Sequence, residues 1–336
     1  MKYCGIDLAN KTSALCILDE EGEIALEVEF PTDEDGFARA MSGYQGMRCV
    51  VEASPLSEWV AGVLEGLGQV VAIIDPRKAK AVITTKKKTD KLDARNLARM
   101  AKTGWYTQVH RKSSSARLLR SQLVARKGLV KVQRQLSNQV RGLLRAHGVR
   151  VGALNNGRFE AKVLELARER CPGLLVALQA LLQSWSSVRG SLVSLTRQMK
   201  AGAVNDEVCG LLMTVPGVGP LVSSAYVATI DDPKRFATGE QVSAYVGLVP
   251  SVHQSGETEY RGRITKEGDG LLRHLLVEAA HVLLTRTRAD SELKRWGQRL
   301  AKRKGAAKAK VAVARKLAII LHRMWLEGSA FRAHRA

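Results

Sequence analysis

The sequence predicts a mixed α/β domain, then a long helical arm, then a mainly helical C-terminal domain. Short apolar runs bounded by turn residues fill the chain up to Asp75, and the apolar spacing then becomes helical over two long stretches. A segment rich in glycine and proline near residue 215 opens a third region. A chain of 336 residues suits two or three domains. We therefore expect domains at 1–110, 111–205 and 206–336.

The first domain is predicted to combine strands in a meander with strands that alternate with helices. A helix is expected to start at Thr32 and Asp33, and another to follow Glu52. Strand-like apolar runs occupy residues 3–8, 14–18, 24–30, 48–52 and 70–74. A meander that gives way to such alternation is the element order of an RNase H-like α/β domain.

The arm is predicted to be a pair of antiparallel helices. Apolar residues recur at helical spacing over 113–147 and again over 178–199, and in the second stretch the gaps alternate between three and four, as in a coiled coil. We expect the two helices to be joined near 150–158. Such an arm can also join subunits, so a homo-oligomer, a dimer or tetramer, is expected.

The third region is predicted to start with a helix-hairpin-helix. Residues 215–220 read Val-Pro-Gly-Val-Gly-Pro and precede an apolar helix. Gly217 and Gly219 there would bring backbone N–H groups close to a phosphate. A polar loop is expected over 251–268, with helices near 270–286 and 306–327.

The charge is concentrated in blocks. Residues 1–75 hold 4 Lys and Arg against 14 Asp and Glu, whereas residues 76–150 hold 21 against 2, and the whole chain has a net charge of +21. A block of cations predicts a nucleic-acid partner. Besides the two glycines, the predicted contacts are Lys86, Lys87, Lys88, Arg95, Arg117, Arg120, Arg126, Lys127, Arg134, Arg141, Arg261, Arg263, Lys266 and Arg273.

Cysteine usage and hydropathy predict the compartment. The five cysteines show no CxxC spacing, which favours buried thiols in a reducing cytosol over disulfides or a zinc site. We find no signal peptide, and no apolar run reaches the roughly 18 residues that span a bilayer. We expect a soluble cytoplasmic bacterial protein associated with the nucleoid and not with a membrane.

Two acidic residues end predicted strands. Asp7 follows Gly5-Ile6, and Glu52 ends the run at 48–52, so that neighbouring parallel strands would place them side by side. Either residue alone is as readily a cap or turn residue. Gly-Ile-Asp also opens actin-like ATPases, but this chain shows neither their second phosphate-binding hairpin nor two similar halves.

Asp90 and Asp93 are the two acids in the basic block of residues 76–150. Three residues apart at a helix start, they share one face and can point at a common ion. Together with Asp7 and Glu52 they make four carboxylates, which suit Mg²⁺ or Mn²⁺. Two such ions would stabilise the attacking and leaving oxygens of an in-line displacement.

Ser255 is the candidate nucleophile. It precedes Gly256 in the polar loop, and such a pair can approach a DNA backbone or simply form a turn. Arg261, Arg263 and Lys266 follow and can bind flanking phosphates. His253 is either a proton relay or a hydrogen-bonding loop residue.

The motifs around these residues resemble the DEDD transposases of insertion sequences, which include the Piv-type DNA invertases. They are Gly5-Ile6-Asp7, Val51-Glu52-Ala53, Lys88-Thr89-Asp90 with Asp93-Ala94-Arg95, and Gly247-Leu248-Val249-Pro250 through Ser255-Gly256 to Ile264-Thr265-Lys266-Glu267-Gly268. The resemblance implies a RuvC-like domain with the acidic quartet Asp7, Glu52, Asp90 and Asp93, a helical linker, and a transposase domain in which Ser255 is the nucleophile. Ala53-Ser54-Pro55 departs from the family's frequent Ala-Thr-Gly.

The expected function is strand exchange on donor and target DNA through a covalent phosphoserine intermediate. The resemblance also implies guidance by a structured RNA of the element, a bridge RNA. The main alternative is a metal-dependent endonuclease like the Holliday-junction resolvases, without a covalent intermediate. A non-catalytic nucleic-acid-binding protein and a tyrosine recombinase acting through Tyr260 are further alternatives.

Overall fold

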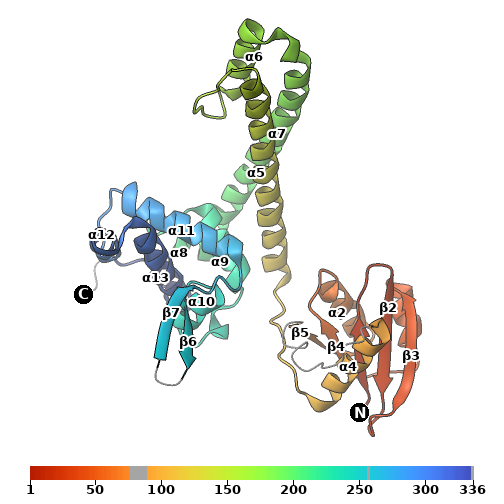
Figure 1. Cartoon of the computed structure of the whole chain (residues 1–336). Coiled ribbons are helices and arrows are strands. Elements are labelled where there is room, and N and C mark those ends of the chain that lie inside the picture. The colour runs from red at the N-terminus through yellow and green to blue at the C-terminus, as the bar shows by residue number, and fades with distance from the viewer. Residues whose placement is uncertain (76–88, 256–257, 334–336) are drawn as a thin grey trace. The chain divides into compact units, whose positions relative to one another are not determined.

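The computed structural model describes residues 1–75, 89–255 and 258–333, which form two compact units. The N-terminal unit is Met1–Lys112 and the C-terminal unit is Ser113–Ala336 (Figure 1). The predicted contacts Lys86, Lys87 and Lys88, and the predicted turn residue Gly256, lie outside the described residues. The domain boundary expected at residue 206 stays a prediction.

The N-terminal unit is built on a five-stranded mixed sheet of order β3-β2-β1-β4-β5. The first three strands pair antiparallel, and β1, β4 and β5 pair parallel. The strands are β1 Tyr3–Asp7, β2 Thr12–Leu18, β3 Ile24–Pro31, β4 Arg48–Glu52 and β5 Val70–Ile74. The predicted mixed α/β class is confirmed.

Helices cover both faces of this sheet, and successive side chains along each strand face one helical layer and then the other. Cys4 and Ile6 of β1 pack in one apolar cluster with α1 (Glu34–Ala40) and α2 (Ser57–Gly66). The intervening Gly5 faces α4 (Asp90–Thr103) on the other side. Asp33 caps α1 by accepting a hydrogen bond from the Gly36 N–H, which confirms the predicted start of that helix.

The segment after α4 returns along the sheet edge. The Val109 N–H donates to the Ile73 carbonyl at 2.7 Å. Arg111 then forms ion pairs with Glu58 and Glu65 on α2. These contacts fasten the end of the N-terminal unit to its own sheet and helix.

The C-terminal unit begins with the predicted helical arm. Helices α5 (Ser114–Ala146) and α7 (Leu175–Asn205) lie side by side (Figure 1). Trp185 Nε1 donates to Ser137 Oγ at 2.8 Å, and Arg126 Nε donates to Thr196 Oγ1 at 3.0 Å. The earlier residue of α5, Arg126, thus pairs with the later residue of α7, Thr196, so the two helices run antiparallel.

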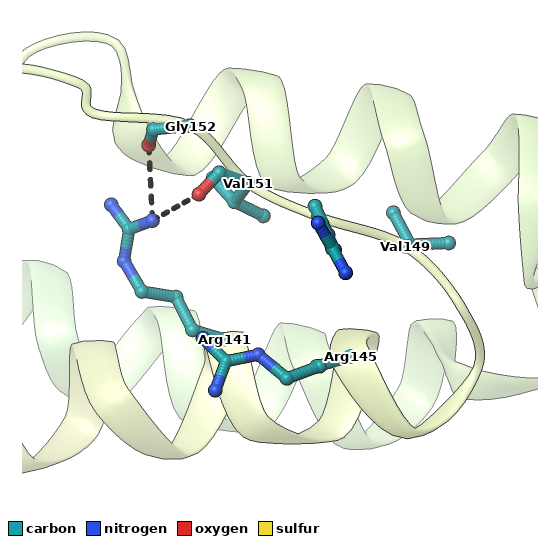
Figure 2. A pocket seen from close by; sticks show the side chains of 6 residues that line it. Arg141, Arg145, Val149, Val151 and Gly152 are labelled. Carbon is teal, nitrogen blue, oxygen red and sulfur yellow. Dashed lines mark hydrogen bonds between the residues drawn. The ribbon is translucent and has the colours of Figure 1, made fainter.

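The tip of the arm differs from the prediction. The helices are not joined directly near 150–158, because α6 (Phe159–Arg170) and a short 3-10 helix (Pro172–Leu174) intervene. Phe159 and its neighbour one turn on, Val163, are buried in one cluster with Trp185. Beside this cluster, Arg141 reaches from α5 to the carbonyls of Val151 and Gly152 in the loop after α5 (Figure 2).

The rest of the C-terminal unit is mainly helical, as predicted, but the expected loop at 251–268 is largely a two-stranded hairpin. A helix at 292–304, absent from the prediction, is also present. The elements are α8 Glu207–Leu212, α9 Pro220–Ile230, a 3-10 helix Pro233–Arg235, α10 Gly239–Tyr245, β6 Pro250–Ser255, β7 Thr258–Ile264, α11 Gly270–Thr285, α12 Glu292–Lys304 and α13 Ala306–Glu327.

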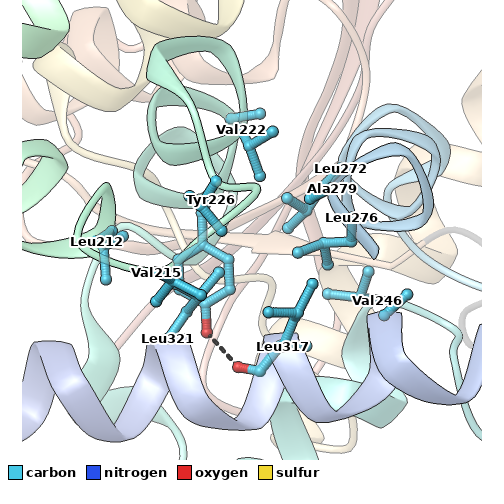
Figure 3. Close-up of a cluster of buried hydrophobic side chains, with 14 of the residues drawn as sticks. Leu212, Val215, Val222, Tyr226, Val246, Leu272, Leu276, Ala279, Leu317 and Leu321 are labelled. Carbon is cyan, nitrogen blue, oxygen red and sulfur yellow. Dashed lines mark hydrogen bonds between the residues drawn. The ribbon is translucent and has the colours of Figure 1, made fainter. Parts of the chain in front are cut away.

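Tyr226 lies at the centre of this helical part. Its ring is buried among leucines and valines of several helices, and its hydroxyl donates to the Ala318 carbonyl at 2.7 Å (Figure 3). In the turn between α8 and α9, Gly217 has φ +93°, and a Cβ there would meet the Ala279 carbonyl at 2.7 Å. Gly217 therefore lets this turn pack directly on α11. Within the described residues, no helix is long and apolar enough to cross a membrane.

Candidate active site

Asp7 and Glu52 end neighbouring parallel strands. In the ladder between β1 and β4, Tyr3 pairs with Arg48 and Ile6 with Val51, so Asp7 and Glu52 occupy the next matching positions. Both are half-buried. The carboxyl edge of the sheet therefore carries two acids on adjacent strands, as the sequence predicted.

Asp90 and Asp93 occupy the first turn of α4. Thr89 caps this helix by accepting a hydrogen bond from the Leu92 N–H at 3.3 Å. Acidic side chains in a first turn are favourable because the helix N-terminus carries partial positive charge. The predicted helix start is confirmed.

The ion pairs of α4 give its direction across the sheet. Near its start, Lys91 lies 3.8 Å from Glu29, whose position is level with Asp7 through the strand ladders. One turn later, Arg95 donates to both oxygens of Glu27 at 2.6 and 2.7 Å, and this contact lowers the pKa of Glu27.

The far end of the same helix lies beside the turn between β2 and β3. A Cβ on Gly22 in that turn would lie 2.6 Å from Lys102 Nζ. Since this turn adjoins the start of β1, α4 runs antiparallel to β1. Its first turn, with Asp90 and Asp93, therefore lies at the sheet edge where β1 ends at Asp7.

Gly5 determines how closely α4 approaches. A Cβ at this position would lie 2.1 Å from the Ala98 nitrogen and 2.2 Å from the Ala94 carbonyl oxygen. Only a glycine permits this backbone-to-backbone packing. The glycine of the Gly-Ile-Asp motif thus places the helix that carries two of the acids against the strand that carries a third.

The four carboxylates suit a hard divalent ion by their chemistry and by the place of their backbones. In the part of the chain that the structure describes, however, no three His, Cys, Asp or Glu side chains are grouped as ligands of one ion. The structure thus brings the supporting elements to one edge, and does not assemble the side chains into a closed site.

Ser255 is the last residue of β6. In the ladder it pairs with Thr258, the first residue of β7, and His253 pairs with Tyr260. Ser255 belongs to the C-terminal unit and the acidic quartet to the N-terminal unit.

The base of this hairpin is held by Arg273, a residue predicted only as a nucleic-acid contact. Its Nη1 donates to the carbonyls of Val246 and Glu267, both at 2.8 Å. The Thr265 N–H donates to the Val249 carbonyl at 2.9 Å. Sequence reasoning missed this supporting role, because carbonyl acceptors leave no trace in side-chain patterns.

Asp269 provides a second support below the hairpin. It caps α11 by accepting from the N–H groups of Leu271 and Leu272, and it pairs with Arg120 of α5. Burial alone would raise the pKa of Asp269, yet the hydrogen bond from Leu272, the Arg120 charge and the hydrogen bond from Leu271 hold that pKa below its ordinary value.

The other predicted nucleic-acid contacts differ in their surroundings. Arg95, Arg126 and Arg141 have protein partners, and burial lowers the pKa of Arg126. The side chains of Arg117, Lys127, Arg134, Arg263 and Lys266 are exposed. The structure describes no side chain for Arg261, and no nearby atom would meet a Cβ on Gly219. All of these contacts stay predictions.

Most of the chain is similar to known transposases. Residues 4–148 match a family model described as Transposase, of the DEDD type of IS110 elements. Residues 209–295 match the model described as Transposase IS116/IS110/IS902 family. A DEDD-type domain suggests a divalent metal requirement.

Relatives in several bacteria extend this similarity. The chain is 32% identical over 296 residues to the "Probable family 20 transposase" of Pseudomonas aeruginosa, covering 84% of this chain and 86% of that protein. It is 28% identical over 340 residues to the "Transposase for insertion sequence element IS1111A" of Coxiella burnetii, covering 99% and 92%. It is 25% identical over 289 residues to the "Transposase for insertion sequence element IS1328" of Yersinia enterocolitica, covering 84% and 85%.

These similarities define a class of enzyme, the DNA transposases. Within that class, the chain belongs to the DEDD-type insertion-sequence transposases of the IS116/IS110/IS902 family. The resemblance drawn from the sequence motifs is confirmed. The mixed sheet with helices on both faces is consistent with an RNase H-like DEDD domain.

Proposed function

We propose that this transposase cuts and exchanges DNA strands with Ser255 as the nucleophile. The acidic quartet Asp7, Glu52, Asp90 and Asp93 would hold Mg²⁺ or Mn²⁺ near the reacting phosphate. The observation that carries the proposal is the convergence of β1, β4 and the first turn of α4 at one sheet edge. Carboxylate oxygens are the ligands that these ions prefer.

The covalent step is a phosphoryl transfer between two hydroxyl oxygens. As the bond from Ser255 Oγ to phosphorus forms, one phosphorus–oxygen bond of the DNA backbone breaks. The serine proton is lost, and the departing DNA oxygen gains a proton. Bound divalent ions would stabilise the charge on the attacking and leaving oxygens. A serine hydroxyl is a weak nucleophile unless its surroundings activate it.

The second step reverses the first on a new strand. A free DNA hydroxyl attacks the phosphoserine, its bond to phosphorus forms, and the bond to Ser255 Oγ breaks. The phosphoserine ester keeps the energy of the original phosphodiester, so strand exchange needs no ATP. The hairpin suits this role, because it carries Ser255 at the end of β6 while the Arg273 contacts hold the opposite end of the two strands.

Three further parts of the protein would contact nucleic acid or a second subunit. The basic block of residues 76–150 would bind donor and target DNA and a structured guide RNA of the element. The antiparallel arm would act as a coiled coil that joins subunits, and the α8–α9 turn would act as a helix-hairpin-helix. Because the quartet and Ser255 belong to different units, a homo-oligomer can complete the site between subunits.

The test compares Ser255→Ala with the double substitution Asp7→Asn and Asp93→Asn. The assay uses the full chain, Mg²⁺, and donor and target DNA with the element's own RNA transcript. We expect Ser255→Ala to lose both strand exchange and covalent attachment to DNA, and the acid-to-amide variant to lose both as well. Ser251→Ala on the same strand is the matched control and should retain both.

The resolvase-like alternative makes the opposite prediction for one variant. If Ser255→Ala still cleaves DNA at the wild-type rate, the enzyme is a metal-dependent nuclease and the serine mechanism is wrong. If the double acid variant keeps its activity, the acidic edge is not the catalytic centre.

A further inference from the structure

A cavity of about 490 Å³ lies at the tip of the arm, between the end of α5 and the loop that follows it. Figure 2 shows Arg141 and Arg145 on consecutive turns of α5, opposite Val149, Val151 and Gly152. Its lining residues are Arg141, Arg145, Val149, Arg150, Val151 and Gly152. Half of these residues are arginines, and none is acidic.

The three arginines of this cavity differ in their contacts. Arg141 donates to the carbonyls of Val151 and Gly152, and its guanidinium lies 5.2 Å from the centre of the Phe159 ring. It therefore holds the loop in place. The side chains of Arg145 and Arg150 are exposed, and within the residues that the structure describes they form neither a hydrogen bond nor an ion pair.

The charge of the cavity is not balanced by nearby sequence. Residues 94–159 contain no Asp and no Glu. Arginines four residues apart on a helix repel each other by a few tenths of a kcal/mol. A cation in the last turn of a helix is stabilised by the partial negative charge of the helix C-terminus, and this accounts for Arg145. It does not account for Arg150, which lies beyond the helix, so folding alone does not explain why both cations face one hollow.

The shape and chemistry of the cavity indicate what fits. Its volume lies within the range of small-ligand sites, roughly 300–1,000 Å³. Guanidinium groups form paired hydrogen bonds with phosphate oxygens. Val151 is half-buried and offers an apolar surface beside the cations, whereas Val149 is buried in the apolar cluster of the arm tip. A phosphate with an attached sugar and base combines an anion with a flat, less polar group in this way.

We propose that this cavity binds one nucleotide of a nucleic-acid strand. Arg145 and Arg150 donate to its phosphate oxygens, and its sugar or base lies over Val151. The site lies at the tip of the arm in the C-terminal unit, and it uses neither the acidic quartet nor Ser255. It therefore stands or falls independently of the cleavage mechanism.

The test measures binding by the full chain in EDTA, so that no cleavage occurs. The probes are a 30-nucleotide single-stranded DNA, an RNA hairpin and a 30-base-pair DNA duplex. The variant Arg145→Ala with Arg150→Ala is compared with Arg168→Ala plus Arg170→Ala, which removes the same charge from exposed positions on α6 of the same arm.

We expect the cavity variant to bind at least one probe about tenfold more weakly. The slope of its log affinity against log salt concentration should be less steep by about one to two, because each phosphate contact that is removed lowers the slope by roughly 0.7–0.9. The control should lose less than about threefold. A loss with RNA alone assigns the site to RNA, a loss with DNA alone assigns it to DNA, and a loss with both assigns it to their shared phosphates.

Equal losses for the two variants with every probe would overturn the proposal, because net charge would then explain the effect. A second variant, Arg145→Lys with Arg150→Lys, keeps the charge and removes the planar fork. We expect it to lose part of the affinity, whereas full wild-type affinity would show a diffuse basic surface instead of a site. Unchanged thermal melting of each variant confirms that folding is intact.

Discussion

Replacing Gly5 with alanine should separate α4 from the sheet. The new Cβ would lie 2.1 Å from the Ala98 nitrogen and 2.2 Å from the Ala94 carbonyl oxygen, and both atoms are backbone that no side-chain rotation can move aside. Reaching a contact distance of 3.4 Å requires the helix to retreat by about 1.3 Å. Overpacking of this kind costs about 1–3 kcal/mol, and a gap near 1 Å forfeits up to half of each dispersion contact beside it.

We therefore expect Gly5→Ala to lower the free energy of unfolding of the N-terminal unit by about 3 kcal/mol. Hydrogen exchange of peptides from residues 1–75 and 90–103, measured in increasing urea, gives this quantity for the N-terminal unit within the full chain. The matched control is Gly62→Ala on α2, where a Cβ meets nothing within 4 Å. It should stabilise the unit by about 0.5–1 kcal/mol, because alanine favours helix.

The same retreat should also reduce strand exchange. A misplacement near 1 Å can cost about a hundredfold in rate, and α4 carries Asp90 and Asp93. If Gly5→Ala unfolds at the wild-type urea concentration, the close packing of α4 on β1 is not as described, and the reasoning about the acidic edge fails with it.

Three further results are expected. In thermal melting, Trp185→Phe should lower the stability of the arm by about 2 kcal/mol and Ser137→Ala by about 1 kcal/mol, because the buried indole of Trp185 donates to the Ser137 hydroxyl. Unchanged stability in both variants would contradict this hydrogen bond. The pKa of Asp269 is lower in the folded protein than in the unfolded chain, so its carboxylate stabilises the fold above the unfolded pKa of about 3.9, and this stabilisation is lost as the pH falls through the folded pKa. The difference in stability between wild type and Asp269→Asn should therefore shrink from pH 5 to pH 2. A constant difference would refute this reasoning. Burial raises the pKa of the Cys209 thiol to about 11, so at pH 8 iodoacetamide should alkylate it far more slowly than an unstructured cysteine, and equal rates would show the thiol to be accessible.

Much of the N-terminal unit could be predicted because its signals are local. The runs at 48–52 and 70–74 match the observed strands β4 and β5 residue for residue. Each strand is bounded by turn residues and is apolar enough to be buried. What the sequence could not give is the direction of α4 across the sheet, which depends on the approach allowed by Gly5 and on ion pairs with β3.

The elements that were missed have weak or mixed patterns. Helix α6 is short and carries charged residues at half of its positions, so its buried face reduces to Phe159, Val163 and Ala167. Helix α12 is strongly basic, with Leu293 and Gly297 as its buried residues, and resembles a solvated segment. The hairpin at Ser255 is polar on both strands, and it forms because the chain on either side of it is held at a common base.

The candidate site was predictable as a set of residues, and less so as a geometry. The four acids are recognisable because each follows a strand or starts a helix, or stands alone among cations. Their relation to Ser255 could not be derived, since Ser255 belongs to the C-terminal unit and the four acids to the N-terminal unit. The supporting roles of Arg273 and Asp269 were equally hidden, because their partners are backbone groups and a distant arginine.

The most direct test of the central claim is to identify the atom that holds DNA during the reaction. Wild-type protein is incubated with donor DNA, target DNA and Mg²⁺, quenched, digested with protease and nuclease, and analysed by mass spectrometry. We expect a phosphate or nucleotide on Ser255, absent when Asp7 and Asp93 are replaced by asparagine. A nucleotide on Tyr260, or strand exchange with no covalent adduct at all, would contradict it.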